Sequence, residues 1–324
     1  MRKSIKGSLE LLNITHTDSK VDYYDVAHLI SPEEEGEMND IRDGGAPIIV
    51  SALYAEDDPT AYFVDKKDKE RNSSLSAKSV RFLNKSDIVL APCESAVEFL
   101  KEQGVTKPIY PCFPGVNLAR FDFSKEEEKE IFHRYYREDK NKKLVIAVGH
   151  YTSEMRGVNA FITAAKKCPN AVFYFIGKLT SRNRLSIRLR KFIKTAPKNV
   201  RFVDVPPDDV YRSALLNADV FMIPGYKIAG VTSIVEAMAA KTQIIARKST
   251  IFDGLLEDGV TAHLAEFSET LASLTRDYLD GKINPTTRQA YEKICQHSLQ
   301  DFGDDLNKYY QLAIKDKVHR RYKL

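Results

Sequence analysis

Short apolar runs alternate along this chain with stretches of helical periodicity. In the first half, the apolar runs predict strands at residues 26–30, 47–53, 86–91 and 107–112. In the second half, they predict strands at 144–148, 171–176, 200–203, 219–223 and 243–246. Runs this short and this continuously apolar suit a sheet that is buried on both faces. Because helical patterns separate them, they imply parallel βαβ crossovers.

The predicted helices are 2–12, 66–84, 94–103, 158–168, 208–216, 233–240 and 252–258, and the polar tail 285–324 is also read as helical. This alternation predicts an α/β fold with two doubly wound, Rossmann-like domains. Residues 1–118 form the first domain, joined by a C-terminal helix at about 302–324, and residues 119–301 form the second. The charged run 125–143 near the boundary reads as a solvated helix face.

The composition and charge of the chain argue against several classes of protein but do not identify its function. The chain has 324 residues and a net charge of +4, which is too weak to argue for a nucleic-acid partner. Its apolar runs are too short to span a bilayer, and its first residues lack the apolar core of a signal peptide. Its cysteines lack metal-ligand spacing, so we expect buried reduced thiols and no metal. The predicted location is cytoplasmic.

Two loops that follow predicted strands contain residues of the kinds that bind phosphate. The first contains Gly149 and Arg156 and precedes a helix whose free N–H groups suit a phosphate, with the arginine adding a charged contact. Its alternative is an ordinary βα loop with a solvated arginine. The second runs from Pro224 through Gly230 into a helix bearing Glu236. That carboxylate needs a partner, either ribose hydroxyls or the backbone N–H groups of its own helix.

Two basic features allow either a functional or an ordinary reading. Lys178 ends a predicted strand, where it would neutralise phosphate or simply face solvent. The segment from Ser181 to Lys194 combines an apolar stripe with surrounding cations. A basic amphipathic helix of this kind either lies on an anionic membrane surface or packs on the core as a surface helix.

Several segments together resemble the family 4 glycosyltransferases, which are retaining enzymes of the GT-B fold. The segments are Gly149 with Arg156-Gly157, residues 199–202, residues 218–224, the helix segment 236–239 and the linker 114–121. The segment 252–260 is most similar to Gram-positive glycosyltransferases that act on diacylglycerol and its glucosides. The resemblance covers nearly the whole chain.

The resemblance implies transfer of a hexose from a nucleotide-diphosphate sugar, by expectation a UDP-sugar, to a lipid or glycan acceptor with retention. The donor is a substrate, and neither a cofactor nor a metal is implied. Arg156 matches the basic diphosphate-binding position, Glu236 the ribose-binding glutamate, and the loop Gly230, Val231, Thr232 and Ser233 the phosphate and sugar contacts. Gly149, His150 and Lys178 complete the expected donor site. A lipid acceptor fits a peripheral place on the inner face of the membrane.

Four departures leave a second interpretation open. Ile228 stands where the family has its first glutamate, and His150 replaces a stronger base. Residues 51–58, which include Leu53, lack the histidine expected after the second strand, and the initial strand and glycine-rich loop are not recognised. The alternative is therefore a catalytically lapsed GT-B protein that acts as a non-catalytic partner or binds sugar nucleotides. A GT-B epimerase of UDP-sugars fits the linker and tail less well.

Overall fold

The computed structural model describes residues 2–19, 21–30, 32–52, 75, 77–121, 126–149, 156–177, 187–225, 231–249 and 252–322. These residues divide into two compact units, and the chain passes between them twice. Unit 1 contains the described residues up to Val116 and those from His297 onward. Unit 2 is built from Asn117–Gln296.

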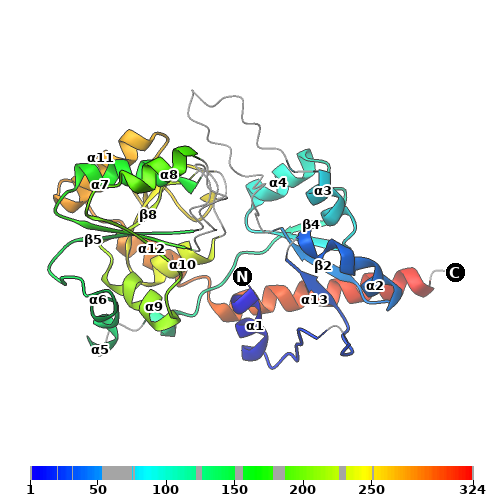
Figure 1. The fold of residues 1–324 in the computed structure, drawn as a ribbon. Coiled ribbons are helices and arrows are strands. Elements are labelled where there is room, and N and C mark those ends of the chain that lie inside the picture. The colour runs from blue at the N-terminus through cyan, green and yellow to red at the C-terminus, as the bar shows by residue number, and fades with distance from the viewer. Residues whose placement is uncertain are drawn as a thin grey trace. The chain divides into compact units, whose positions relative to one another are not determined.

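Unit 1 has a parallel sheet in the order β1-β2-β3-β4. Its strands are β1 (Ala27–Leu29), β2 (Ile48–Ser51), β3 (Ile88–Ala91) and β4 (Ile109–Pro111). Every residue of β2 and β3 is buried, as continuous apolar runs require. Helices α1 (Arg2–Leu11) and α13 (Leu299–Tyr322) pack together against the sheet, and α2 (Met38–Asp43), α3 (Ala77–Asn84) and α4 (Glu94–Glu102) complete the unit (Figure 1).

The last helix belongs to unit 1 through an apolar stripe that its polar composition hides. Phe302, Leu306, Tyr309, Tyr310 and Ala313 are buried on α13 in one cluster with side chains of α1, β2 and β3. The backbones of α1 and α13 approach closely at Gly303, where an added Cβ would lie 3.1 Å from the carbonyl oxygen of Ser8. The tail is therefore part of the core of unit 1.

Unit 2 has a parallel sheet in the order β10-β9-β8-β5-β6-β7. The strands are β5 (Leu144–Val148), β6 (Val172–Ile176), β7 (Val200–Val203), β8 (Val220–Ile223), β9 (Gln243–Arg247) and β10 (His263–Ala265). From β5 the chain adds β6 and β7 on one side, then returns to add β8, β9 and β10 on the other. This is the strand order of a Rossmann fold, with its switch point between β5 and β8.

Helices cover both faces of this second sheet, as Figure 1 shows. Helices α7 (Val158–Lys167), α8 (Ile187–Lys194) and α11 (Ser268–Leu279) contribute to one large buried cluster with β5 and β6. Helices α9 (Asp208–Asn217), α10 (Thr232–Ala239) and α12 (Thr287–Ile294) lie on the other face. The two short helices α5 (Glu126–Lys129) and α6 (Ile131–Tyr136) pack on α9. The prediction of two doubly wound α/β units is confirmed.

Some local predictions are wrong. The helix predicted at 252–258 is a series of turns, because Gly254 adopts a φ of +77°, which helix geometry excludes. The charged run 125–143 is more than a solvated face, since Phe132 within it is fully buried. Cys112 and Cys168 are buried as expected, but Cys295 is exposed and Cys93 is intermediate.

A histidine ties three elements of unit 1 together. The half-buried ring of His28 on β1 lies with Nδ1 2.7 Å from the hydroxyl of Tyr310 and Nε2 2.8 Å from the hydroxyl of Ser51. Burial lowers the pKa of His28 to about 4, so the ring is neutral at neutral pH. Both nitrogens can then be satisfied by hydroxyl groups, each of which donates or accepts.

We expect the stability of unit 1 to fall as the pH drops from about 6.5 to about 4. Over that window the unfolded chain binds a proton at His28 that the folded chain does not, so acid favours unfolding. His28→Gln should flatten this part of a plot of unfolding free energy against pH, measured by urea denaturation. His319→Gln, a change of an exposed histidine on α13, should keep the slope. An identical slope for wild type and His28→Gln would contradict the prediction.

Candidate functional site

The reversal of strand order in unit 2 brings two loops together. The loop after β5 and the loop after β8 both leave the carboxyl ends of neighbouring parallel strands. In open α/β sheets, ligands bind outside the carboxyl ends of the strands at such a switch point. Each loop leads into a helix, α7 in one case and α10 in the other. The two loops singled out from the sequence therefore belong to one region.

Among the described residues, the end of the β5 loop at Gly157 packs closely on the start of the β8 loop at Pro224 and Gly225. Gly157, the N-cap of α7, has a φ of +78°. A Cβ added there would lie 2.3 Å from the carbonyl carbon and oxygen of Pro224 and 2.5 Å from the backbone nitrogen of Gly225. Only glycine permits both this conformation and this close approach.

A buried arginine holds the other side of the contact. Arg247, at the end of β9, is 1% exposed, and its Nε donates to the carbonyl of Pro224 at 3.1 Å. Its Nη2 donates to the hydroxyl of Ser268 at 2.8 Å, and its Nη1 donates to the carbonyl of Glu266. A guanidinium presents five donors in a fixed fork, so one side chain can connect β9, the β8 loop and the start of α11.

The start of α7 has the features of an anion site. Gly149 follows β5 with a φ of +147°, and its N–H bonds the carbonyl of Ile176 at 2.9 Å. Arg156 stands directly before the N-cap and is 9% exposed. The free N–H groups of a helix start, with the helix dipole, favour a phosphate. A nearby arginine adds a charge that matches phosphate geometry.

The start of α10 carries hydroxyl and carboxylate side chains, in contrast to the arginine before α7. Val231 is the N-cap and is buried, whereas Thr232 and Ser233 in the first turn are half-buried. One turn further, Glu236 is the charged residue on a helix whose Ile234, Val235, Ala237, Met238 and Ala239 are all buried. Its side chain is 15% exposed.

Glu236 is partnered by side chains from elsewhere in unit 2. Arg120 lies in the 3-10 helix η3 (Leu118–Phe121), and its Nη1 donates to Oε1 of Glu236 at 3.1 Å. Tyr211 on α9 donates its hydroxyl to Oε2 at 3.2 Å. The sequence predicts neither partner, because it points to ribose hydroxyls or to the backbone N–H groups of the helix itself. Burial raises the pKa of Glu236, and the charge of Arg120 and the bond from Tyr211 oppose that rise.

Part of the expected donor site lies outside the described residues. The residues that the structure does not describe include His150, Lys178, Ile228 and Gly230, and also Leu53 in the first half of the chain. The structure places Gly149 and Arg156 on the β5 side of the switch point, and Val231, Thr232, Ser233 and Glu236 on the β8 side. Their joint role in binding a donor stays a prediction.

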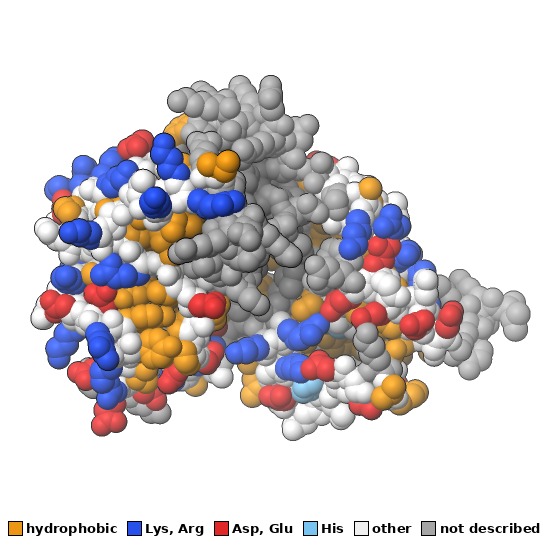
Figure 2. Space-filling model, viewed as in Figure 1, with side chains coloured by type: hydrophobic (Ala, Val, Ile, Leu, Met, Phe, Trp, Pro, Cys, Tyr) orange, Lys and Arg blue, Asp and Glu red, His pale blue; other side chains and the backbone are white. Residues whose placement is uncertain are grey.

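The described part of the basic segment behaves as a surface helix. On α8, Leu189 is fully buried, and Phe192 and Ile193 pack against the core of unit 2. Ile187 is 84% exposed at its start. In Figure 2, Lys and Arg side chains over this unit are mixed with acidic and apolar ones. Among the described residues, no helix is long and apolar enough to cross a membrane.

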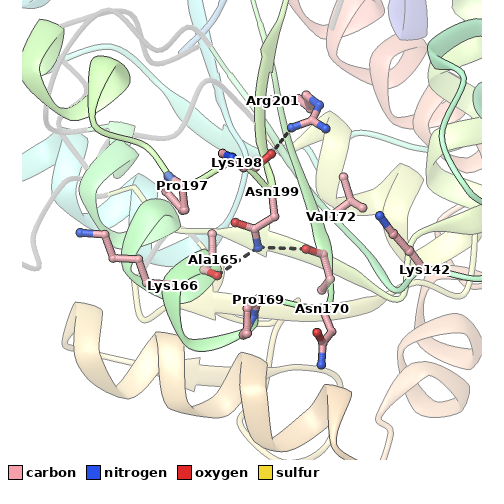
Figure 3. Close-up of a pocket in the computed structure, with 11 residues that line it drawn as sticks. Lys142, Ala165, Lys166, Pro169, Asn170, Val172, Pro197, Lys198, Asn199 and Arg201 are labelled. Carbon is pink, nitrogen blue, oxygen red and sulfur yellow. Dashed lines mark hydrogen bonds between the residues drawn. The ribbon is translucent and has the colours of Figure 1, made fainter.

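A pocket of about 710 Å³ lies at the opposite edge of the sheet, where β6 and β7 begin (Figure 3). Lys142, Lys166, Lys198 and Arg201 surround it. Asn199 Nδ2 donates to the carbonyls of Ala165, Cys168 and Ala171 at 3.1, 3.0 and 2.9 Å, which caps the end of α7. Cations at a helix C-terminus complement its negative end, so this basic pocket has a structural explanation.

Comparisons with known proteins agree on the family and on the fold. The family model described as "Glycosyl transferases group 1" matches residues 128–294, which lie within unit 2. The chain is 26% identical over 237 residues to the processive diacylglycerol alpha-glucosyltransferase of Acholeplasma laidlawii, covering 72% of this chain and 69% of that protein.

Solved structures of two bacterial proteins share the fold at low identity. HepE of Anabaena, crystallised with UDP-glucose, superposes with a TM-score of 0.72 at 15% identity, covering 96% of this chain and 81% of its own. Sucrose-phosphate synthase from Thermosynechococcus elongatus gives a TM-score of 0.72 at 15% identity, covering 90% and 74%.

We expect Gly157→Ala to destabilise unit 2 more than a similar change elsewhere. Alanine at 157 must adopt a left-handed conformation and also displace the backbone of Pro224, which together should cost roughly 2–4 kcal/mol. Gly254→Ala is the control, because Gly254 has a φ of +77° but open space around its Cα. Urea denaturation of both variants measures the difference. Equal losses would show that the contact with Pro224 is unimportant.

Proposed function

This chain belongs to the group 1 glycosyl transferases, and we propose that it transfers a hexose from a nucleoside-diphosphate sugar to a lipid or glycan acceptor with retention of configuration. It is a glycosyltransferase with two Rossmann-like units of the GT-B type. The observation that carries the proposal is the pair of helix starts at the switch point of unit 2, one beside Arg156 and one leading to Glu236.

In this proposal the donor diphosphate lies at the start of α7. The helix N-terminus and Arg156 supply positive potential, which also stabilises the charge that develops on a departing nucleoside diphosphate. Gly149 leaves room for close approach, and His150 and Lys178 are proposed as further phosphate contacts. The loop Gly230–Ser233 contacts the phosphate and the sugar, and Glu236 accepts from ribose hydroxyls. No metal takes part in this scheme.

We also propose which nucleotide the donor sugar carries and which class of molecule accepts the sugar. HepE is crystallised with UDP-glucose, and a shared fold favours UDP-glucose as the first donor to test. The Acholeplasma relative is named for diacylglycerol, which supports a lipid acceptor, and with it a peripheral place on the inner face of the membrane. Contact through the segment from Ser181 to Lys194 would rest on its cations and on the exposed Ile187, since Leu189, Phe192 and Ile193 pack in the core.

The alternative, a lapsed enzyme that binds sugar nucleotides or a partner without turnover, is favoured by two sequence positions. Ile228 replaces a glutamate of the family pattern, and the segment that contains Leu53 lacks the expected histidine. A site that has lost a polar partner for the sugar discriminates poorly among sugars, whereas phosphate contacts are unaffected. Binding of UDP without measurable transfer would select this alternative.

We expect UDP and UDP-glucose to raise the thermal unfolding temperature in a panel that also contains GDP- and ADP-sugars, because a ligand of the native state stabilises it. Arg156→Ala should weaken UDP binding by about 10- to 150-fold, the loss of about 1.5–3 kcal/mol from one charge-assisted contact. Arg201→Ala is the control, since Arg201 lines the pocket at the opposite edge of the sheet. A panel in which no nucleotide shifts the transition would contradict the proposed function.

Ile228→Glu should increase donor hydrolysis or transfer, because a carboxylate can bond the sugar hydroxyls that isoleucine leaves unpaired. The measurement is release of UDP from UDP-glucose with and without diacylglycerol vesicles, for wild type and variant. Fast wild-type transfer from one strictly selected sugar would argue against this, and would mean that another residue, Lys227 or Thr232, has taken over the sugar contact.

A further inference from the structure

Glu236 is one member of a four-residue bridge that spans three elements of unit 2. We call Arg120, Asp208, Tyr211 and Glu236 the Glu236 bridge. Arg120 divides its guanidinium between two carboxylates, with Nη1 on Glu236 at 3.1 Å and Nη2 on Asp208 at 2.5 Å. Tyr211 occupies the second oxygen of Glu236. Each Glu236 oxygen is thus held by a different side chain, which fixes the plane of the carboxylate.

Within the bridge, the Glu236 carboxylate can still accept further hydrogen bonds. A carboxylate has about four lone-pair sites, and the bridge uses one on each oxygen, so acceptor capacity remains. With both acids ionised, one arginine does not neutralise them, and the bridge carries a net negative charge. Such a group accepts hydrogen bonds from hydroxyls and repels phosphates. This preference agrees with a donor whose phosphates lie at the start of α7 and whose hydroxyls lie at Glu236.

Without its partners, Glu236 would lose this ability. The side chain is 15% exposed on an otherwise apolar helix, and burial favours the neutral acid. Arg120 counters the effect by charge, and Tyr211 by a hydrogen bond. Tyr211 stays protonated because its own pKa is raised well above the usual value by burial and by the charge of Glu236. Asp208 is the other charged group in the bridge and acts in the opposite direction to Arg120.

Arg120 is itself held in place by its surroundings. Its guanidinium lies 5.8 Å from the ring centre of Phe121, which is buried. Arg212 of α9 donates to the carbonyl of Arg120 at 3.3 Å. The 3-10 helix that carries Arg120 begins two residues after Val116, the last residue of unit 1 before the chain enters unit 2. The first helical turn of unit 2 therefore supplies a fixed cation for Glu236.

We propose that Arg120 and Tyr211 are positioning residues for donor recognition, which keep the Glu236 carboxylate charged and oriented so that its remaining lone pairs accept from donor hydroxyls. This inference rests on the proposed function of Glu236 as the ribose contact. It assigns a role to two residues that themselves need not touch the donor.

The test is isothermal titration calorimetry of UDP and UDP-glucose between pH 5 and pH 8.5. Arg120→Gln should weaken binding by about tenfold or more near pH 6 and by less at pH 8, because protonation of Glu236 moves to higher pH when its cation is removed. Arg120→Lys should restore part of the affinity at low pH. Tyr211→Phe should shift the profile in the same direction by a smaller amount, and Glu236→Gln should abolish the pH dependence that Glu236 causes.

Arg201→Gln is the matched control, because Arg201 pairs with Glu138, whose side chain is 13% exposed, much like that of Glu236. Its binding profile should match that of wild type. If Glu236→Gln weakens binding but Arg120→Gln and Tyr211→Phe retain the wild-type profile, the positioning role is overturned and the proposed function stands. Tighter binding by Arg120→Gln also overturns it. If wild type binds no nucleotide sugar, the proposed function fails first, and the inference fails with it.

Discussion

The backbone contact between Gly157 and Pro224 is the constraint on which the candidate site depends. Two parallel strands, β5 and β8, are neighbours although β6 and β7 separate them along the chain. Their following loops must share the space at the carboxyl edge, and a residue without a side chain lets them do so. Arg247 then connects the β8 loop to β9 and α11 from within the protein. The helix starts on either side are thus fixed before any ligand arrives, and preorganised dipoles are effective for that reason.

Much of the fold could be predicted because parallel strands leave a strong pattern. Each predicted strand is present within a residue or two where the chain is described, since strands buried on both faces are continuous apolar runs. The missed strand, β10, has three residues and lies at the edge of its sheet. Helix α11 was also not predicted, although Leu271 and Ala272 are buried and Leu274, Tyr278 and Leu279 pack against the same core. The short length of β10 explains why that strand was missed, but α11 has the apolar spacing of an ordinary amphipathic helix.

The contacts of the candidate site could be predicted from the sequence less well than the fold. The sequence indicated that Glu236 needs a partner, but the spacing between Arg120 and Glu236, 116 residues along the chain, carries no signal of contact. The stripe on α8 shows a second limit, because periodicity identifies an apolar face without saying whether core or membrane covers it. His28 shows a third, since its neutrality depends on burial between a strand and a helix that begins far along the chain.

The passage of the chain from unit 1 into unit 2 and back again orders events during synthesis. The sheet of unit 1 is complete once β4 has left the ribosome, but the helix that covers Ile49, Ile88 and Leu90 is encoded after all of unit 2. Domains usually fold as they emerge, from the N-terminus onward. Here the earlier unit waits with an open apolar face while the later one folds. The core of the N-terminal unit therefore cannot be completed until α13 has been synthesised, after the whole of unit 2.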